Sequence, residues 1–134
     1  MCAVERSMLL VKPDGVAKGL VDRIRELIVA AQLRVVEERR KTITVATATE
    51  LYREFSHRDY FPELVEFMAS APLHIFIVEG EDAIRKVREI IGKREPASGI
   101  RMLWAESIIR NVAHGPHTPA ESEEQTRLLM EEGS

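Results

Sequence analysis

The spacing of hydrophobic and polar residues predicts alternating strands and helices along the chain. Short apolar runs at Ser7–Val11 and Leu73–Val78 are typical of buried strands, and residues that favour turns follow each of them. Apolar residues recur at helical spacing across 20–31 and Ala83–Ile91, which predicts two amphipathic helices. Residues 34–45 are rich in β-branched side chains but carry charges in the middle, which indicates a partly exposed strand.

The last third of the chain carries weaker patterns. Residues 93–104 are interrupted by proline and glycine and are expected to be irregular, whereas 110–113 predict one last short strand. Thr118 is expected to cap a final helix with Glu121 completing a capping box, and the glutamate-rich tail after Arg127 is expected to fray. Strands separated by helices predict an α+β fold: a ferredoxin-like α/β sandwich, with a small antiparallel sheet covered by helices.

Composition narrows the class of protein. A length of 134 residues predicts a single domain over 1–134, and 45% hydrophobic with 31% charged residues excludes a disordered or fibrous chain. The net charge of -3 and the 5% aromatic content argue against a nucleic-acid partner. No apolar run approaches the roughly 20 residues of a membrane span, and the single cysteine, Cys2, cannot form an internal disulfide. We therefore expect a cytoplasmic protein.

Of the four histidines, His114 has the most unusual setting. It ends a short apolar stretch and precedes a Gly-Pro pair and a helix N-terminus, whose free N–H groups favour anions. His57 lies in a polar stretch and His74 within a strand, so surface or core roles suit them. His114 and His117 also form an H-x-x-H pair, but zinc needs three or four ligands and few other side chains are suited to complete the set. Catalysis at His114 is the stronger alternative and metal binding the weaker.

Three cations suggest how a polyphosphate would be held. Lys12 follows the first strand, Arg88 lies on a predicted helix, and Arg101 lies in the irregular segment. Each alone is typical of a solvated surface; together with His114 they describe a phosphate cradle. The sequence contains neither G-x-x-x-x-G-K-[ST] nor G-x-G-x-x-G, so a glycine-rich phosphate loop is excluded.

Several short motifs, in a particular order, give the chain a family likeness. They are Val11–Val16, Gly19–Val21, Tyr60–Met68, Glu79–Gly80, Ile100–Arg101 and Arg110–Gly115. Each is modest alone, but in this order and at these intervals the chain resembles a nucleoside diphosphate kinase from Glu5 to about Leu129.

The resemblance implies a ferredoxin-like core and a reversible ping-pong reaction, in which a nucleoside triphosphate phosphorylates a histidine and a nucleoside diphosphate takes the phosphoryl group. By this match His114 takes the position of the nucleophile, and Mg²⁺ reaches the site on the phosphates rather than on protein ligands. The positions that match phosphate and ribose contacts are Lys12, Tyr52, Arg88, Arg94, Arg101 and Asn111. The positions that match the apolar base clamp are Tyr60, Leu64 and Ile108.

The chain departs from the family pattern beside the nucleophile. Pro116 and His117 stand where a Ser-Asp pair is usual, and Gln125 stands where a glutamate of the last helix supports the site. The segment before Ile100 is about four residues shorter than the family's, and Arg94 falls where a threonine is expected. A neutral amide orients a histidine by hydrogen bonding but does not stabilise its positive form as a carboxylate does. We therefore expect activity that is present but reduced.

The resemblance also implies an assembly and leaves alternatives open. Family members form dimers that join into tetramers or hexamers, so we expect a homo-oligomer, a dimer at minimum. The main alternative function is a catalytically weak or inactive nucleotide-binding relative that acts as a sensor or partner protein. A sheet that binds nucleic acid is a third, weaker alternative, because the sequence lacks aromatic pairs and a basic face.

Overall fold

A computed structural model describes residues 4–92, 98–107 and 109–131. Strands and helices follow one another in the order β1 (Val4–Val11), α1 (Pro13–Ala17), α2 (Val21–Ala30), β2 (Arg34–Lys41), α3 (Val45–Leu51), the 3₁₀ helix η1 (Arg53–Phe55), α4 (Phe61–Met68), β3 (Leu73–Glu81), α5 (Ala83–Ile91), α6 (Gly99–Trp104), β4 (Ala113–His114) and α7 (Pro119–Glu131).

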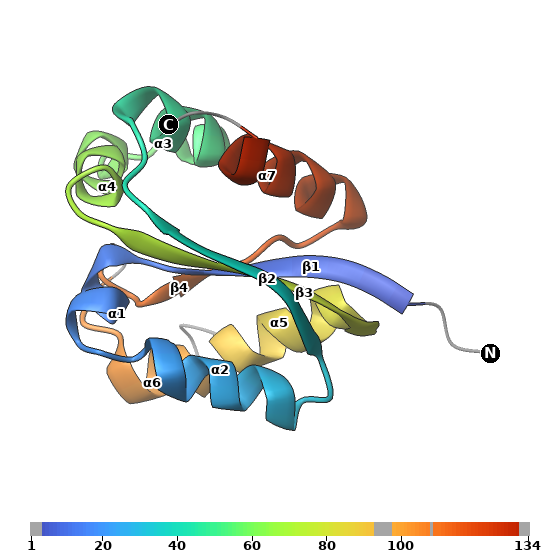
Figure 1. Cartoon of the computed structure of the whole chain (residues 1–134). Helices are drawn as coiled ribbons and strands as arrows, with labels where there is room; N and C mark the ends of the chain where they lie inside the picture. Colours follow the sequence, from blue (N-terminus) through green and yellow to red (C-terminus); the bar gives the residue numbers. More distant parts are fainter. Residues whose placement is uncertain (1–3, 93–97, 108, 132–134) are drawn as a thin grey trace.

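The strands form one antiparallel sheet in the order β2-β3-β1-β4. Figure 1 shows α3, α4 and α7 over one face of the sheet and α1, α2, α5 and α6 over the other. This arrangement confirms the prediction of a ferredoxin-like α+β fold. The short strand β4 pairs with the C-terminal end of β1, where Leu10 is opposite His114 and Val11 is opposite Ala113. His114 therefore lies beside the strand end from which Lys12 emerges.

Alternation along the central strands divides the hydrophobic core into two layers. Met8 and Leu10 of β1 pack in one cluster with residues of α3, α4 and α7. Leu9 and Val11 pack in the other cluster with residues of α2, α5 and α6. Successive side chains of a strand point to opposite faces, so the continuous apolar run of β1 is buried on both sides.

The structure corrects the predictions at the ends of two strands. The expected turn after β1 is the short helix α1, with Pro13 in its first turn. Proline suits this position because its ring sets a helical φ and its missing N–H would have no helical partner. The strand predicted over 34–45 ends at Lys41, because Thr44 caps α3 by accepting a hydrogen bond from the Thr47 backbone N–H at 3.1 Å.

The segment 93–104, predicted to be irregular, contains helix α6. Ile100 anchors it in the core with 1% of its surface exposed. Gly92 ends α5 as predicted, with φ +85°, and a Cβ built on it would lie 1.8 Å from the carbonyl oxygen of Ser98. Only glycine allows this approach, which holds the start of α6 against the end of α5 and thereby positions Arg101.

As far as Glu131, where the described residues end, the C-terminal tail is helical rather than frayed. Helix α7 continues to Glu131, and Leu129 is fully buried. Lys41 Nζ donates a hydrogen bond to the carbonyl oxygen of Leu129 at 2.6 Å, and Arg39 donates one to the carbonyl oxygen of Met130 at 2.8 Å. These two cations satisfy carbonyl groups of the last turn of the helix, which no helical N–H reaches.

Candidate active site

The imidazole of His114 is buried between β1 and α7, with 8% of its surface exposed. Its Nε2 lies 3.0 Å from Gln125 Oε1, and its ring centre lies 5.0 Å from that of Tyr52. An amide oxygen only accepts hydrogen bonds, so Nε2 carries the proton and donates it. The lone pair of the neutral ring is then on Nδ1, which is the nitrogen available for nucleophilic attack.

The surroundings of His114 keep it neutral. Burial, followed by the positive charge of Lys12, lowers the pKa of His114 to about 3, although its hydrogen bond to Gln125 acts in the opposite direction. A histidine attacks phosphorus only in its neutral form. The imidazole is therefore in the reactive form throughout the physiological pH range.

Lys12 caps the N-terminus of α1 and is 3% exposed. Its Nζ donates a hydrogen bond to the carbonyl oxygen of Ile109 at 3.3 Å and lies 5.5 Å from the centre of the Tyr52 ring. Burial lowers the pKa of Lys12 to about 7, the charge of Asp14 opposes that shift, and the charge of Arg101 adds to it. A buried ammonium group is costly when it is unpaired, so an anion bound beside Lys12 would stabilise its charged form.

Two arginines complete the cationic surroundings. Arg88 on α5 donates a hydrogen bond to the carbonyl oxygen of Gly115 at 3.2 Å, so it contacts the residue that follows the histidine. Burial lowers the pKa of Arg88, against the opposing charge of Glu121, but a guanidinium remains charged at neutral pH. Arg101 on α6 acts electrostatically on both Lys12 and Tyr52. Of the three cations predicted from the sequence, Lys12 and Arg88 thus act on His114 directly, and Arg101 acts on its neighbours Lys12 and Tyr52.

Tyr52 differs from the others in its orientation. Its ring is 3% exposed and contacts His114, but its hydroxyl donates a hydrogen bond to the sulfur of Met68 at 3.8 Å. Burial raises the pKa of Tyr52 above its ordinary value. In this structure Tyr52 is an aromatic wall of the site, and the hydroxyl contact to a phosphate stays a prediction.

Two of the three residues of the predicted base clamp lie in the described part of the chain. Tyr60 caps the N-terminus of α4 and packs on the core cluster that contains Leu64, which is 3% exposed. Ile108, the third predicted member, and Arg94, a predicted phosphate contact, lie outside the described residues. The clamp therefore stays a prediction.

An unusual backbone conformation lies between two of the predicted site residues, Asn111 and His114, and the sequence did not predict it. Asn111 is 5% exposed and His114 follows three residues later, yet Val112 between them has φ +76°. This left-handed conformation interrupts the strand predicted over 110–113 and leaves β4 with only Ala113–His114. The carboxylate of Asp14 accepts a hydrogen bond from the Val112 N–H at 3.0 Å. Asp14 stands in the family motif Val11–Val16, which was the only sequence signal for it.

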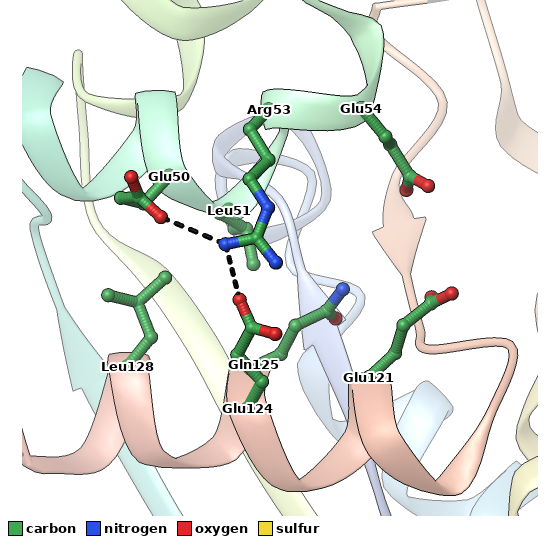
Figure 2. A pocket seen from close by; sticks show the side chains of 8 residues that line it. All are labelled: Glu50, Leu51, Arg53, Glu54, Glu121, Glu124, Gln125 and Leu128. Atoms are coloured by element: carbon green, nitrogen blue, oxygen red, sulfur yellow. Dashed lines mark hydrogen bonds and ion pairs between the residues drawn. The ribbon is translucent and has the colours of Figure 1, made fainter.

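Gln125 separates His114 from an acidic pocket of about 220 Å³ between α3, η1 and α7. Figure 2 shows its lining: Glu50, Leu51, Arg53, Glu54, Glu121, Glu124, Gln125 and Leu128. Arg53 forms ion pairs there with Glu124 at 2.6 Å and Glu50 at 3.1 Å. The remaining carboxylates repel a polyphosphate, so this pocket is unsuited to the nucleotide.

The alternative of a metal site on the H-x-x-H pair gains no further ligand. His117 is exposed, and its Nδ1 lies 3.6 Å from Glu121 Oε1. Within 4–92, 98–107 and 109–131, no group of three or more histidine, cysteine, aspartate or glutamate side chains is placed to hold a metal ion. His74, expected to be a core histidine, contacts Glu38 at 2.8 Å.

The fold and site define a class of protein: an α+β protein whose sheet carries a neutral, buried histidine among cations suited to a polyphosphate. The sequence profile of the nucleoside diphosphate kinase family matches residues 5–134. The chain is 42% identical to the nucleoside diphosphate kinase of Azorhizobium caulinodans over 117 residues, which are 84% of each chain. It is 39% identical to that of Halorhodospira halophila over 132 residues, 96% of this chain and 94% of the relative.

A solved structure shows the same architecture. The crystal structure of the Aquifex aeolicus nucleoside diphosphate kinase superimposes with a TM-score of 0.87 at 32% identity, covering 98% of this chain and 97% of that chain. The chain belongs to the nucleoside diphosphate kinase family, which confirms the predicted phosphotransferase class.

Proposed function

We propose that this chain transfers the γ-phosphoryl group of a nucleoside triphosphate to a nucleoside diphosphate through a phosphohistidine on His114. Family membership supports the nucleoside diphosphate kinase reaction. One observation supports the residue: His114 is buried and neutral, its Nε2 is held by Gln125, and cations surround it.

In the first half-reaction, the lone pair of His114 Nδ1 attacks the γ-phosphorus, and the bond from that phosphorus to the β,γ-bridging oxygen breaks. The electron pair leaves with the nucleoside diphosphate. Nε2 keeps its proton, which stays hydrogen-bonded to Gln125 Oε1. In the second half-reaction, a terminal oxygen of another diphosphate attacks the phosphohistidine, and the N–P bond returns its electrons to Nδ1. Negative charge on the transferred group is stabilised by the positive charges of Lys12, Arg88 and Arg101.

A divalent cation, Mg²⁺, enters this proposal as part of the substrate. The side chains nearest His114 are cationic or neutral, and one carboxylate oxygen of Asp14 is engaged by the Val112 N–H. This set suits the phosphates of a nucleotide that brings its own ion. Bound there, the ion would neutralise phosphate charge and orient the oxygens.

We further propose one domain over 1–134, a cytoplasmic location and a homodimer at minimum. No helix in the described part of the chain is long and apolar enough to cross a membrane.

The end strand β2 carries Glu37, Glu38, Arg39 and Arg40 in succession, so an antiparallel second copy would oppose glutamates with arginines.

Sedimentation velocity at micromolar concentration tests the dimer. We expect a species of twice the chain mass or larger, and reversal of charge at Arg40 (Arg40→Glu) should shift it towards the monomer. A monomer in the unaltered protein would contradict the proposed assembly.

The phosphoenzyme is the direct test of the proposed function. Purified protein is mixed with Mg²⁺ and excess ATP, and its intact mass is measured before and after addition of a nucleoside diphosphate. We expect one added phosphoryl group that the diphosphate removes. If ATP binds by calorimetry but no phosphoenzyme forms, the alternative of a nucleotide-binding sensor replaces the kinase, and Gln125 and Pro116 are its cause.

We expect the neutral amide of Gln125 to limit the rate. The double variant Gln125→Glu with Pro116→Ser is expected to raise turnover about tenfold, because a hydrogen bond from Nε2 to a carboxylate stabilises positive charge on the ring more strongly than one to an amide. Steady-state rates at saturating nucleotide measure this. The control is Gln32→Glu, which adds the same charge at an exposed position far from Gln125 in the sequence. An unchanged or lower rate in a folded double variant would refute this explanation of reduced activity.

A further inference from the structure

The backbone just before His114 adopts a conformation that valine rarely tolerates. Val112 has φ +76°, and the Ala113 N–H donates a hydrogen bond to the carbonyl oxygen of Asn111 at 2.9 Å. A bond from residue i+2 to residue i around a central φ near +75° is a classic γ-turn, a rare and strained conformation. Such a β-branched residue stays there only if its surroundings hold it.

The segment after β1 holds this turn from both sides. Asp14 Oδ2 accepts a hydrogen bond from the Val112 N–H at 3.0 Å, and the Lys12 N–H donates one to the Val112 carbonyl oxygen at 2.7 Å. Gly15 allows the close approach, since a Cβ built on it would lie 3.0 Å from Val112 Cγ1 and 3.1 Å from its carbonyl oxygen. Both polar backbone groups of the strained residue are thus bonded to the N-terminus of α1.

The residues on either side of the turn belong to the proposed site. Asn111 precedes it and His114 lies two residues beyond it, on β4 opposite Leu10. A γ-turn reverses the chain within three residues, so a change in the φ of Val112 would rotate Asn111 relative to His114. Asp14 is 6% exposed and lies 98 residues from Val112 in sequence. Its carboxylate accepts the hydrogen bond that holds the N–H of this strained residue.

We propose that Asp14 is a positioning residue for the phosphoryl-transfer reaction: its carboxylate holds the strained turn at Val112 and thereby sets Asn111 and His114 in their relative orientation. This inference rests on the proposed function of the site. Asp14 touches no reacting atom in the scheme above and acts only through Val112. Its negative charge has a second, separable effect, because it favours the charged form of Lys12.

Two conservative variants separate the hydrogen bond from the charge. Asp14→Asn keeps an oxygen acceptor at the same distance and removes the charge, whereas Asp14→Glu keeps the charge and displaces the acceptor by one methylene. We expect Asp14→Asn to retain the phosphorylation rate at saturating Mg–ATP within about threefold while raising the KM for nucleotide. We expect Asp14→Glu to lower the saturated rate at least tenfold.

The readouts are single-turnover phosphorylation by intact mass and the thermal midpoint of each variant. Asp14→Ala is the third variant, expected to lose the saturated rate like Asp14→Glu, and it keeps the test open if the glutamate variant does not fold. The control is Glu5→Ala, which removes a carboxylate that accepts a hydrogen bond from the Ile84 N–H at 2.8 Å, away from His114. This control is expected to leave the rate unchanged.

The outcome distinguishes positioning from stability and from the chemistry. Equal rates in all folded Asp14 variants, or a larger loss in Asp14→Asn than in Asp14→Glu, would overturn the proposal. The ¹H–¹⁵N spectrum of histidine-labelled protein reports the Nε2–H form of His114 without any phosphoryl transfer. If the unaltered protein forms no phosphoenzyme but Asp14→Ala still shifts the His114 resonances and Asp14→Asn does not, the proposed function fails and the positioning role stands.

Discussion

Replacing His114 with alanine is expected to abolish the phosphoenzyme and to lower the rate of phosphoryl transfer at least about 10⁴-fold. The expected loss is this large because, among the site residues that the structure describes, the other candidate nucleophiles are less suited to attack phosphorus. Lys12 is partly protonated near neutral pH, and the Tyr52 hydroxyl faces Met68. Coupled-assay turnover and intact mass after incubation with Mg–ATP measure the two effects.

His117→Ala is the matched control for this variant. His117 lies three residues from His114 in sequence but is exposed to solvent, so its loss should leave the rate and the phosphoenzyme unchanged. Loss of the phosphoenzyme in His117→Ala, with its retention in His114→Ala, would show that His117 is the nucleophile and would contradict the assignment to His114. A phosphoryl group found in both single variants would contradict a single histidine nucleophile.

The second-order rate constant for nucleotide, kcat/KM, is expected to fall as the pH rises above about 7. Burial lowers the pKa of Lys12 to about 7, so the free protein holds a charged ammonium below that pH and a neutral amine above it. The charged fraction decreases about tenfold for each pH unit above the pKa, and kcat/KM reports the free protein. Bound phosphates favour the charged form, so kcat at saturating nucleotide should change much less.

Lys12→Arg tests the cause of this pH profile. A guanidinium keeps its charge throughout the range, so kcat/KM of the variant should be flat between about pH 7 and 9, whatever its absolute value. Lys12→Met, which never carries the charge, should lower kcat/KM about 10²-fold at pH 6.5 and much less at pH 9. A profile in the unaltered protein that stays flat to pH 9 would contradict the assignment to Lys12.

Local hydrophobic patterns were sufficient to predict the strands and helices that bury one or both of their faces in the core. The apolar run in β1 and the helical spacing in α2 and α5 carry the core, and the structure has these elements close to the predicted bounds. Two of the wrong predictions concern segments whose order depends on distant partners. Helix α6 is held through Ile100 and the close contact at Gly92, and the tail of α7 is held by Lys41 and Arg39.

The site divides in the same way. The types of residue needed for phosphoryl transfer could be recognised along the chain, as could the family motifs that contain Lys12, Arg101 and His114. The Tyr52 hydroxyl was expected at a phosphate, but its orientation depends on the position of Met68 on the next helix. The bond between Asp14 and Val112 joins residues 98 positions apart, and no local pattern announces it.

The amino-acid sequence alone determines the fold class, the family and a short set of candidate site residues, because periodicity and motifs are properties of neighbouring positions. Tertiary structure decides which of these groups become reactive. Burial keeps His114 neutral and lowers the pKa of Lys12, and a hydrogen bond from Val112 to Asp14 joins the segment before His114 to the segment after Lys12. Desolvation and long-range hydrogen bonds arise only when distant segments exclude water together.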